Sequence, residues 1–306
     1  MKGKKITGLI VATITPVNRN GDFDPGLMQS MIDILLEKGC EGVFGIGSTG
    51  NFPLFSTEER KVAAEAHVKA VKGRVPVCIH IGSDTETQTL ELARHAGEIG
   101  VDSFAAVPPY YYKYDAAALT AYFSRVAAIN PDLPFYVYNI PMYAANDVTP
   151  AILKSMKDVI PNLAGVKDTT QDFTRFIDYV DVMGTDFGNI MGSDGMCVAA
   201  HVMGGAGGIC AMASHNPELM AAIFRLVRAG EIEEARRLQF LASRLRLLFM
   251  KLPFFTPRVT IMRRRGIVDA WPRNPMRNLS AEQETLLFDT MSTLEDEFNF
   301  PLLSKV

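Results

Sequence analysis

The chain has 306 residues, a formal net charge of −3 and 48% hydrophobic residues. This length fits one large domain, or one domain with an extension, and the apolar fraction is sufficient for a substantial core. No basic block predicts nucleic-acid binding, and no apolar run reaches the ~18 residues of a membrane span. Composition therefore predicts a globular protein with no nucleic-acid partner and no membrane partner.

The cysteines and histidines do not form a recognisable metal or redox motif. Cys40, Cys78, Cys197 and Cys210 show no CxxC pairing and no zinc-ligand spacing. Isolated thiols of this kind are typical of a reducing compartment, so we expect a cytoplasmic protein. The sequence has no HExxH motif, no Walker loop and no Rossmann fingerprint, and no metal site is predicted.

Short apolar runs alternate with helical patterns through residues 1–229. The runs predicted as strands cover residues 8–14, 42–47, 75–81, 103–107, 135–138, 163–167, 187–191 and 207–210. The predicted helices cover residues 25–37, 56–71, 85–99, 116–128, 173–182 and 196–203. Others begin at Thr149-Pro150 and Asn216-Pro217, where Thr149 and Asn216 are the predicted N-caps. Ser56 with Glu59, and Thr85 with Gln88, have the spacing of capping boxes.

This alternation predicts a (β/α)8 TIM barrel. Eight strand–helix units follow one another at intervals of roughly 20–35 residues. A doubly wound open sheet is the alternative, but it usually carries a glycine fingerprint after its first strand. Beyond Ala229 the pattern changes to helices at 231–250, 256–265 and 280–298 without strands. We therefore predict a barrel with the active site over residues 1–229 and a C-terminal helical extension over residues 230–306.

Lys167 stands at the end of the sixth predicted strand, directly after the apolar run Leu163–Val166. In TIM barrels the chemistry lies at the carboxyl ends of the strands, so the amine would face a mostly apolar cavity. Burial can lower a lysine pKa from ~10.4 by ~3–5 units, and desolvated lysines form Schiff bases with carbonyl substrates. The alternative is that Lys167 ends its strand and extends to solvent.

Two other strand ends carry chemistry that suits such an amine. Tyr138 ends the neighbouring strand and can carry a proton to and from a carbinolamine. The turn Gly47–Gly50 offers the hydroxyls of Ser48 and Thr49, and successive backbone N–H groups, to an anion. Each feature alone could be an ordinary loop or a packing tyrosine. Together they favour a small α-keto acid, with its covalent imine on Lys167 in place of any separate cofactor.

These residues resemble the pyruvate-dependent class I aldolases that include dihydrodipicolinate synthase and N-acetylneuraminate lyase. The resemblance covers essentially the whole chain. Its motifs, in order, are Thr15-Pro16, the Gly-Ser-Thr-Gly turn, the Pro-Tyr-Tyr segment from Pro109, Tyr138-Asn139-Ile140-Pro141 and Gly165-Val166-Lys167-Asp168-Thr169.

The resemblance implies roles for individual residues. Lys167 would form the Schiff base with pyruvate, Tyr138 would relay protons, and Ser48 and Thr49 would hold the pyruvate carboxylate. Ile209 would line the pyruvate side of the site. Tyr111 matches a position that reaches across a tight dimer in the family, and a homotetramer built as a dimer of dimers is implied.

Departures from the family's motifs concern the acceptor aldehyde. Dihydrodipicolinate synthases usually have an arginine two positions after the proline of the Tyr-Asn-x-Pro motif. Tyr143 stands there, and a tyrosine cannot supply a bidentate cation. The Ser48-Thr49 pair and Thr169 instead favour the sialic-acid and sugar-acid lyases.

The lyase resemblance has departures of its own. Sialic-acid lyases typically follow the aspartate after strand seven, here Asp194, with a glutamate, whereas this chain has Gly195. Ala211 stands where a serine is expected. We expect Tyr143, Thr169 and Asp194 to contact the substrate, in a site less polar than that for sialic acid.

The sequence therefore predicts a lyase that reversibly cleaves a 2-keto-3-deoxy sugar acid or sialic acid to pyruvate and an aldehyde. A 4-hydroxy-tetrahydrodipicolinate (dihydrodipicolinate) synthase or a keto-deoxy acid dehydratase would use the same lysine. Two further alternatives are a non-catalytic pyruvate-binding protein and a barrel that binds phosphate through Gly204–Gly208. The identity of the aldehyde stays open at this point.

Overall fold

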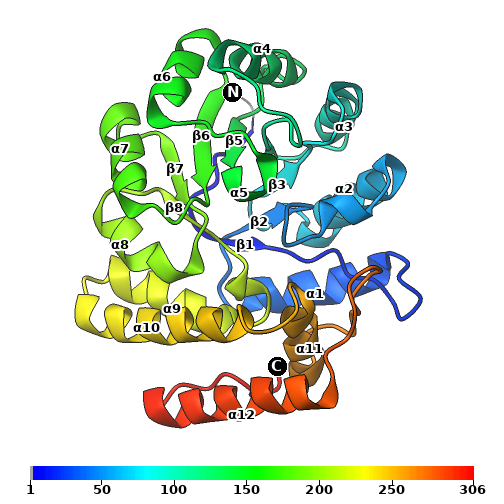
Figure 1. Cartoon of the computed structure of the whole chain (residues 1–306), viewed down its shortest axis with the longest axis vertical. Coiled ribbons are helices and arrows are strands. Elements are labelled where there is room, and N and C mark those ends of the chain that lie inside the picture. Colours follow the sequence, from blue (N-terminus) through cyan, green and yellow to red (C-terminus); the bar gives the residue numbers. More distant parts are fainter. Residues whose placement is uncertain (1–2) are drawn as a thin grey trace.

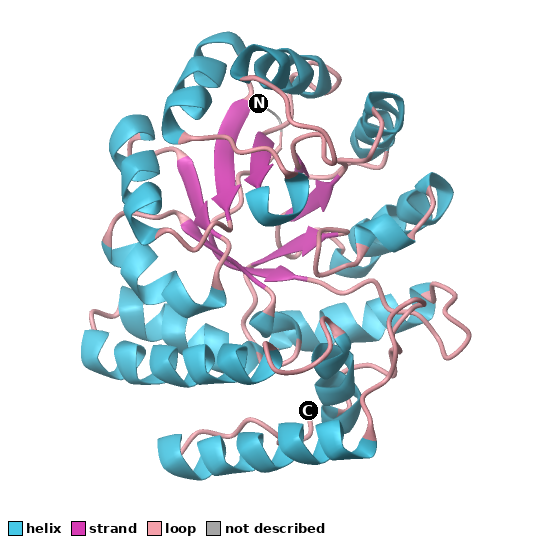
Figure 2. Ribbon diagram, viewed as in Figure 1, coloured by secondary structure: helices cyan, strands magenta, loops and turns pink. Residues whose placement is uncertain are grey.

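Eight parallel strands close into one barrel in sequence order in the computed structural model, which describes residues 3–306. Helices surround the barrel on the outside (Figures 1 and 2). The strands are β1 (Gly8–Ala12), β2 (Gly42–Gly45), β3 (Val77–His80), β4 (Ser103–Ala106), β5 (Phe135–Asn139), β6 (Leu163–Asp168), β7 (Gly188–Met191) and β8 (Gly207–Cys210). The predicted TIM barrel is confirmed.

The α-helices of the barrel part are α1 (Pro25–Glu37), α2 (Thr57–Val71), α3 (Glu86–Glu98), α4 (Ala116–Ala127), α5 (Pro141–Ala144), α6 (Pro150–Val159), α7 (Phe173–Met183), α8 (Cys197–Val202) and α9 (Pro217–Arg228). Three short 3₁₀ turns follow β2, β7 and β8: η1 (Phe52–Leu54), η2 (Asp194–Met196) and η3 (Met212–Ser214). The C-terminal helices are α10 (Ile232–Phe249), α11 (Thr256–Arg265) and α12 (Ala281–Phe298). No helix within residues 3–306 is both long and apolar enough to cross a membrane.

Local capping patterns predicted several helix starts, with two corrections. The capping box at Ser56 and Glu59 forms both of its bonds. At Thr85 one of the two bonds forms: the Thr85 hydroxyl accepts from the Gln88 N–H, but the Gln88 side-chain oxygen accepts from the Ser83 hydroxyl at 2.9 Å. The capping box predicted there is therefore wrong in its second half.

Asn216 occupies the N-cap position of α9, but its side chain does not cap the helix. Its amide instead donates to the carbonyl of Leu302 at 2.8 Å. The predicted cap is therefore wrong, because a partner 86 residues further along the chain takes the side chain. This bond ties the end of the chain to the loop after β8.

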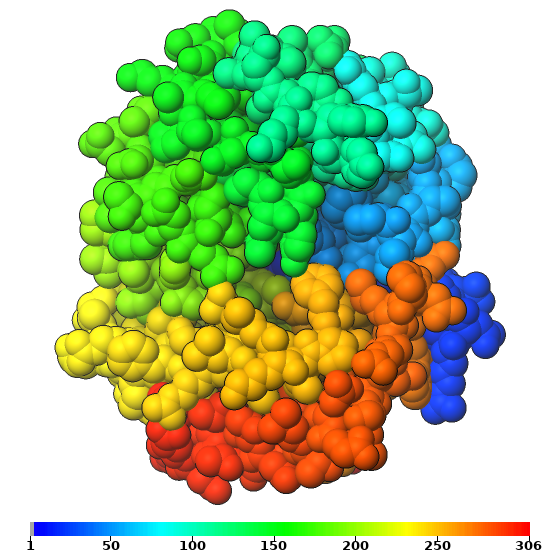
Figure 3. Space-filling model, viewed as in Figure 1, coloured from blue at the N-terminus to red at the C-terminus, as the bar shows by residue number. Residues whose placement is uncertain are grey.

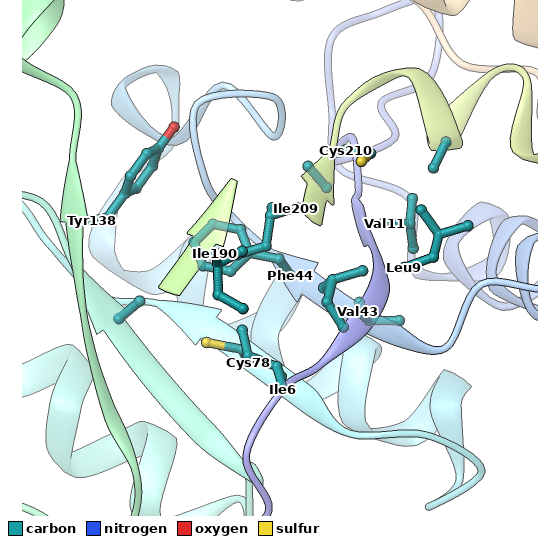
Figure 4. Close-up of a cluster of buried hydrophobic side chains, with 14 of the residues drawn as sticks. Ile6, Leu9, Val11, Val43, Phe44, Cys78, Tyr138, Ile190, Ile209 and Cys210 are labelled. Atoms are coloured by element: carbon teal, nitrogen blue, oxygen red, sulfur yellow. The ribbon is translucent and has the colours of Figure 1, made fainter. Parts of the chain in front are cut away.

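Large side chains fill the interior of the barrel. Figure 4 shows Phe44, Cys78 and Ile190 pointing toward one another from different strands. At another level of the barrel Tyr136 is fully buried, and its hydroxyl accepts the Ile6 N–H at 3.0 Å. Gly165 lies against this ring, since a Cβ there would be 2.4 Å from a ring carbon of Tyr136. The glycine in the motif before Lys167 is thus required by packing.

The C-terminal helices pack against the barrel part rather than standing apart. Helix α10 contacts α9, α8 and η2, and α12 packs on α10 (Figure 1). Gln239 on α10 donates to the carbonyl of Asp194 at 2.8 Å and accepts the N–H of Val198 at 3.1 Å. The extension therefore holds the segment that follows β7.

Gly165→Ala tests the close packing below the strand end. The added methyl group would also lie 2.4 Å from the carbonyl oxygen of Gly188, so the barrel must deform. We expect the free energy of unfolding to fall by about 1–3 kcal/mol or more, measured by chemical denaturation. The control is Gly26→Ala in α1, whose methyl group meets only the side-chain oxygen of the N-cap Asp24, at 3.1 Å. An unchanged stability of Gly165→Ala would contradict the packing argument.

Candidate active site

The ends of β5 and β6 bring Tyr138 and Lys167 side by side. The two residues are register partners in the parallel ladder. The Lys167 Nζ lies 3.9 Å from the centre of the Tyr138 ring and 4.3 Å from the centre of the Phe44 ring on β2. The Lys167 residue is 4% exposed. The alternative in which this lysine extends to solvent is therefore wrong.

Burial lowers the pKa of Lys167 from 10.5 to about 7. Electrostatic interactions with Cys78, Asp194 and Cys210 raise the pKa by less than burial lowers it. A large fraction of the amine is therefore uncharged near neutral pH, which is the form that attacks a carbonyl carbon. The two aromatic rings can still stabilise the charged form through their faces.

A pair of hydroxyls lies beside the amine. The Tyr138 hydroxyl donates to the Ser48 Oγ at 3.2 Å. Burial raises the pKa of Tyr138 to about 12, while the Ser48 hydrogen bond lowers it by less. Tyr138 is thus a neutral phenol near pH 7, with one oxygen that can accept a proton while its own proton passes toward Ser48.

His80 positions the turn that carries Ser48, a role that the sequence analysis did not predict. Its Nδ1 donates to the carbonyl of Ile46 at 3.0 Å, and its Nε2 accepts the Val107 N–H at 3.3 Å. Burial first, and then the charge of Arg60, holds the pKa of His80 well below its usual value. A neutral ring with both nitrogens occupied fixes Ile46, which has a φ of 57° immediately before the hydroxyl turn. We assign His80 as a positioning residue.

Asn139 is a second positioning residue that the sequence analysis did not single out. Its side-chain amide donates to Asp147 at 3.0 Å and to Asp168 at 3.1 Å, and its Oδ1 accepts the N–H of Val148 at 3.0 Å. The residue is fully buried directly after Tyr138. A buried amide at a strand end is expected to organise the main chain around it, and its place in the Tyr-Asn-x-Pro motif was the available signal.

The other residues predicted to bind substrate, Thr49, Thr169 and Ile209, differ in whether the protein already uses their side chains. The Thr49 hydroxyl has no hydrogen-bond partner within residues 3–306, which leaves it free for a ligand. The Thr169 hydroxyl donates to the carbonyl of Asn139 at 2.8 Å, so in this structure it holds the strand end. Ile209 is buried in the barrel interior (Figure 4). Substrate contacts of Thr169 and Ile209 stay predictions.

Two cavities open at this end of the barrel, where Figure 3 shows a hollow at the centre of the molecular face. The first has a volume of about 290 Å³ and is lined by residues that include Ser48, Asn51 and Tyr110. The second has a volume of about 380 Å³ and includes Asp194 in its lining. Tyr143 lines both cavities. Lys167 belongs to neither lining, but each cavity includes a residue linked to the reactive pair: Ser48 accepts from the Tyr138 hydroxyl, and Asp194 raises the pKa of Lys167.

Asp194, the residue predicted after strand seven, belongs to η2 and lines the second cavity. Its Oδ1 accepts the Met212 N–H at 3.2 Å. Burial raises the pKa of this carboxyl, whereas the positive charges of Arg258 and Lys167 act in the opposite direction. The carboxyl group is therefore placed where a substrate hydroxyl can donate to it.

Tyr143 and Tyr111 are both solvent-exposed in the single chain. Tyr143 is 57% exposed, and its ring lies 6.3 Å from that of Phe254 in an edge-to-face contact. Tyr111 is 83% exposed, packs on Tyr112 and lies outside the linings of the two cavities. Its contact across a dimer stays a prediction.

The glycines of β8 are explained by strand packing. A Cβ on Gly207 would lie 2.4 Å from the carbonyl oxygen of Gly8 on the neighbouring strand. A Cβ on Gly208 would lie 2.9 Å from the Phe224 ring and 3.1 Å from the Cys210 sulfur. Close approach of the chain therefore accounts for these two glycines without a phosphate ligand.

Lys167→Met tests the energetic cost of the buried amine. Because the folded-state pKa of about 7 lies below the ordinary 10.5, the unfolded chain binds more protons between these pH values. Lys167 thus makes the wild-type stability rise with pH across this window. We expect Lys167→Met to raise the free energy of unfolding by about 1–4 kcal/mol at pH 7, a gain that shrinks toward pH 10. Denaturant unfolding at both pH values, with the exposed Lys154→Met as control, measures it, and an equal gain at both values would contradict the pKa shift.

Comparison with known proteins agrees with this geometry. The model of the dihydrodipicolinate synthetase family matches residues 5–294. The chain is 32% identical to the 4-hydroxy-tetrahydrodipicolinate synthase of Brucella abortus biovar 1 (strain 9-941) over 234 residues, which are 76% of this chain and 80% of that protein. It is 33% identical to the probable 2-dehydro-3-deoxy-D-pentonate aldolase YjhH of Escherichia coli (strain K12) over 238 residues, 77% of this chain and 79% of that protein.

Among solved structures, the chain is similar to YagE, a prophage protein of the dihydrodipicolinic acid synthase family from E. coli K12, in complex with pyruvate. The TM-score is 0.91 at 28% identity, with 94% of this chain and 98% of that chain covered. The family match spans the barrel and most of the C-terminal helices. The chain therefore belongs to the dihydrodipicolinate synthetase family and is an enzyme of the pyruvate-dependent class I aldolases.

Proposed function

We propose that the protein reversibly cleaves a 2-keto-3-deoxy sugar acid to pyruvate and an aldehyde, through a Schiff base on Lys167. The observation that carries this proposal is the dry amine of Lys167 beside the Tyr138 phenol, which is itself bonded to Ser48. The identity to YjhH, whose name describes an aldolase of this substrate class, supports it. Sialic acids are less favoured substrates, because Gly195 and Ala211 remove polar groups from the aldehyde side.

The first half of the reaction forms the imine. The neutral amine of Lys167 attacks the ketone carbon of the keto acid, and the hydroxyls of Ser48 and Thr49 hold the substrate carboxylate. Tyr138 protonates the carbinolamine oxygen, which leaves as water, and a protonated imine remains on Lys167. The positive charge of the imine then attracts the electrons of the neighbouring carbon–carbon bond.

The second half breaks the bond between C3 and C4 of the keto acid. The C4 hydroxyl gives its proton to the Tyr138 oxygen, C4 becomes the carbonyl carbon of the aldehyde, and the bonding electrons form an enamine at C3. Protonation of C3 returns the imine of pyruvate. Water hydrolyses that imine, which releases pyruvate and restores the free amine.

A 4-hydroxy-tetrahydrodipicolinate synthase that uses the same lysine is the second candidate. The identity to the Brucella enzyme supports it, and Tyr143 in place of the expected arginine weighs against it. In either case we propose that the covalent imine on Lys167 serves as the electron acceptor and that the enzyme uses no separate cofactor. We further propose that the enzyme works in the cytoplasm as a homotetramer.

Borohydride reduction in the presence of pyruvate tests the imine. We expect a stable covalent adduct on Lys167, located by peptide mass spectrometry, because the reagent reduces the imine to an amine. Lys167→Ala should give no adduct and no cleavage of a keto-deoxy acid, whereas the exposed Lys154→Ala should behave like the wild type. An adduct on another lysine would overturn the assignment, and an adduct without cleavage of any keto-deoxy acid would favour a non-catalytic pyruvate-binding protein.

Tyr138→Phe separates proton transfer from imine formation. The ring that covers the Lys167 amine remains, but the hydroxyl bonded to Ser48 is lost. We expect the cleavage rate to fall by about 10²–10⁴-fold, while the borohydride adduct still forms on prolonged incubation. Ser48→Ala, which leaves the phenol in place, should cause a smaller fall. A Tyr138→Phe enzyme with the wild-type rate would refute the relay.

A further inference from the structure

Arg258, in the first turn of α11, carries a charge without a protein partner. Its Nε is buried and has no hydrogen bond, and no ion pair of its guanidinium occurs within residues 3–306. Its ring contact is a loose one, with the guanidinium carbon 5.7 Å from the centre of the Phe254 ring. Burial lowers the pKa of Arg258, although the charge of Asp194 opposes this effect. An unpaired, partly desolvated guanidinium is costly, so such groups usually have a function.

Arg258 lines the second cavity together with Asp194, Tyr143 and His215. The His215 ring is fully buried, and its Nδ1 donates to the Oδ1 of Asn216 at 2.8 Å. Its Nε2 is therefore an unprotonated acceptor and, like the Arg258 Nε, is buried without a hydrogen-bond partner. Burial, followed by the charge of Arg258, lowers the pKa of His215 to about 3, so this acceptor is neutral at physiological pH.

The cavity thus contains an unused donor and an unused acceptor in one lining, which is the pattern of a site built for a ligand rather than a packing defect. Arg246 adds a second positive charge, and its guanidinium bonds the side-chain oxygen of Gln171. The positive charges of Arg246 and Arg258 exceed the single carboxylate of Asp194 in this lining. A ligand with a negative end would balance the charge.

The backbone before α11 is strained where the cavity is formed. Phe255, the residue before the helix, has a φ of 73° and is buried. Non-glycine residues rarely adopt such angles, and the surrounding structure must maintain them. This strain sets the start of the helix and thereby the place from which Arg258 enters the cavity.

We propose that Arg258 is a specificity residue that binds an anionic end, carboxylate or phosphate, of the acceptor aldehyde. The proposal deepens the function assigned above and rests on it. In this arrangement the aldehyde carbon reacts at the imine on Lys167. The hydroxyls of the aldehyde donate to Asp194 and to the His215 Nε2, and its terminal anion binds the Arg258 guanidinium. A guanidinium fork pairs with two oxygens of either anion, which a tyrosine at position 143 cannot do.

Condensation of pyruvate with three-carbon aldehydes tests this proposal. Glyceraldehyde is neutral, tartronate semialdehyde ends in a carboxylate, and glyceraldehyde 3-phosphate ends in a phosphate. We expect the wild type to prefer an anionic aldehyde over glyceraldehyde, and the preferred member identifies the anion. Arg258→Gln should lower kcat/KM for that aldehyde by about 10- to 100-fold, mostly through KM, and leave glyceraldehyde within about threefold.

Two further variants separate recognition from structure. Arg258→Lys keeps the charge but loses the fork, so it should retain part of the preference. Arg264→Gln changes an exposed arginine on the same helix and should match the wild type with all three aldehydes. Each variant is checked for an unchanged melting temperature and for the borohydride adduct of pyruvate on Lys167.

The outcomes distinguish this proposal from the function on which it rests. Equal losses for neutral and anionic aldehydes in Arg258→Gln, or a wild type without preference, would overturn the role of Arg258 while the adduct on Lys167 still forms. Absence of that adduct in the wild type would overturn the proposed function itself, and the specificity proposal with it. A loss confined to the anionic aldehydes supports the proposal.

Discussion

The exclusion of water from one amine is the constraint on which this active site depends. Lysine is ordinarily charged, and each unit by which its pKa falls costs about 1.36 kcal/mol. The closed barrel of eight strands keeps water away from this amine, and the rings of Phe44 and Tyr138 lie over the Lys167 Nζ. The strand register then fixes the phenol next to the nitrogen. The same packing of neighbouring strands therefore positions both the nucleophile, Lys167, and the proton carrier, Tyr138.

Around this pair, buried polar side chains hold the main chain rather than the substrate. His80 fixes the turn before Ser48, Asn139 fixes the loop after Tyr138, and Gln239 fixes the carbonyl of Asp194. Each of these side chains uses both its donor and its acceptor capacity. Such preorganisation lets reacting groups keep their geometry without reorganising during the reaction. The three positioning residues come from β3, β5 and α10, so the site is a property of the whole chain.

Much of the fold and the centre of the site followed from the sequence, because both depend on local patterns. Eight strand–helix units gave the barrel, and the rule that chemistry lies at strand ends gave Lys167 and Tyr138. The false caps at Thr85 and Asn216 show the limit of local patterns, since Asn216 bonds a residue 86 positions away. Arg258 was beyond this reasoning for a similar reason. Helix α11 has four arginines, of which Arg265 is buried in polar contacts, Arg264 is exposed and Arg263 lies over Trp271. Composition cannot tell which of them enters a cavity.

The second cavity is lined by two parts of the chain that have different tasks. Its inner side comes from the segments that follow β5, β6, β7 and β8, next to the strands that hold Tyr138 and Lys167. Its outer side comes from residues 246–258, which carry no part of the imine chemistry. Natural variation can therefore exchange the outer wall and leave the inner wall intact. Enzymes with this architecture can acquire new substrates by drift in one helical segment, and a library of variants restricted to that segment would explore substrate range at little risk to the reaction itself.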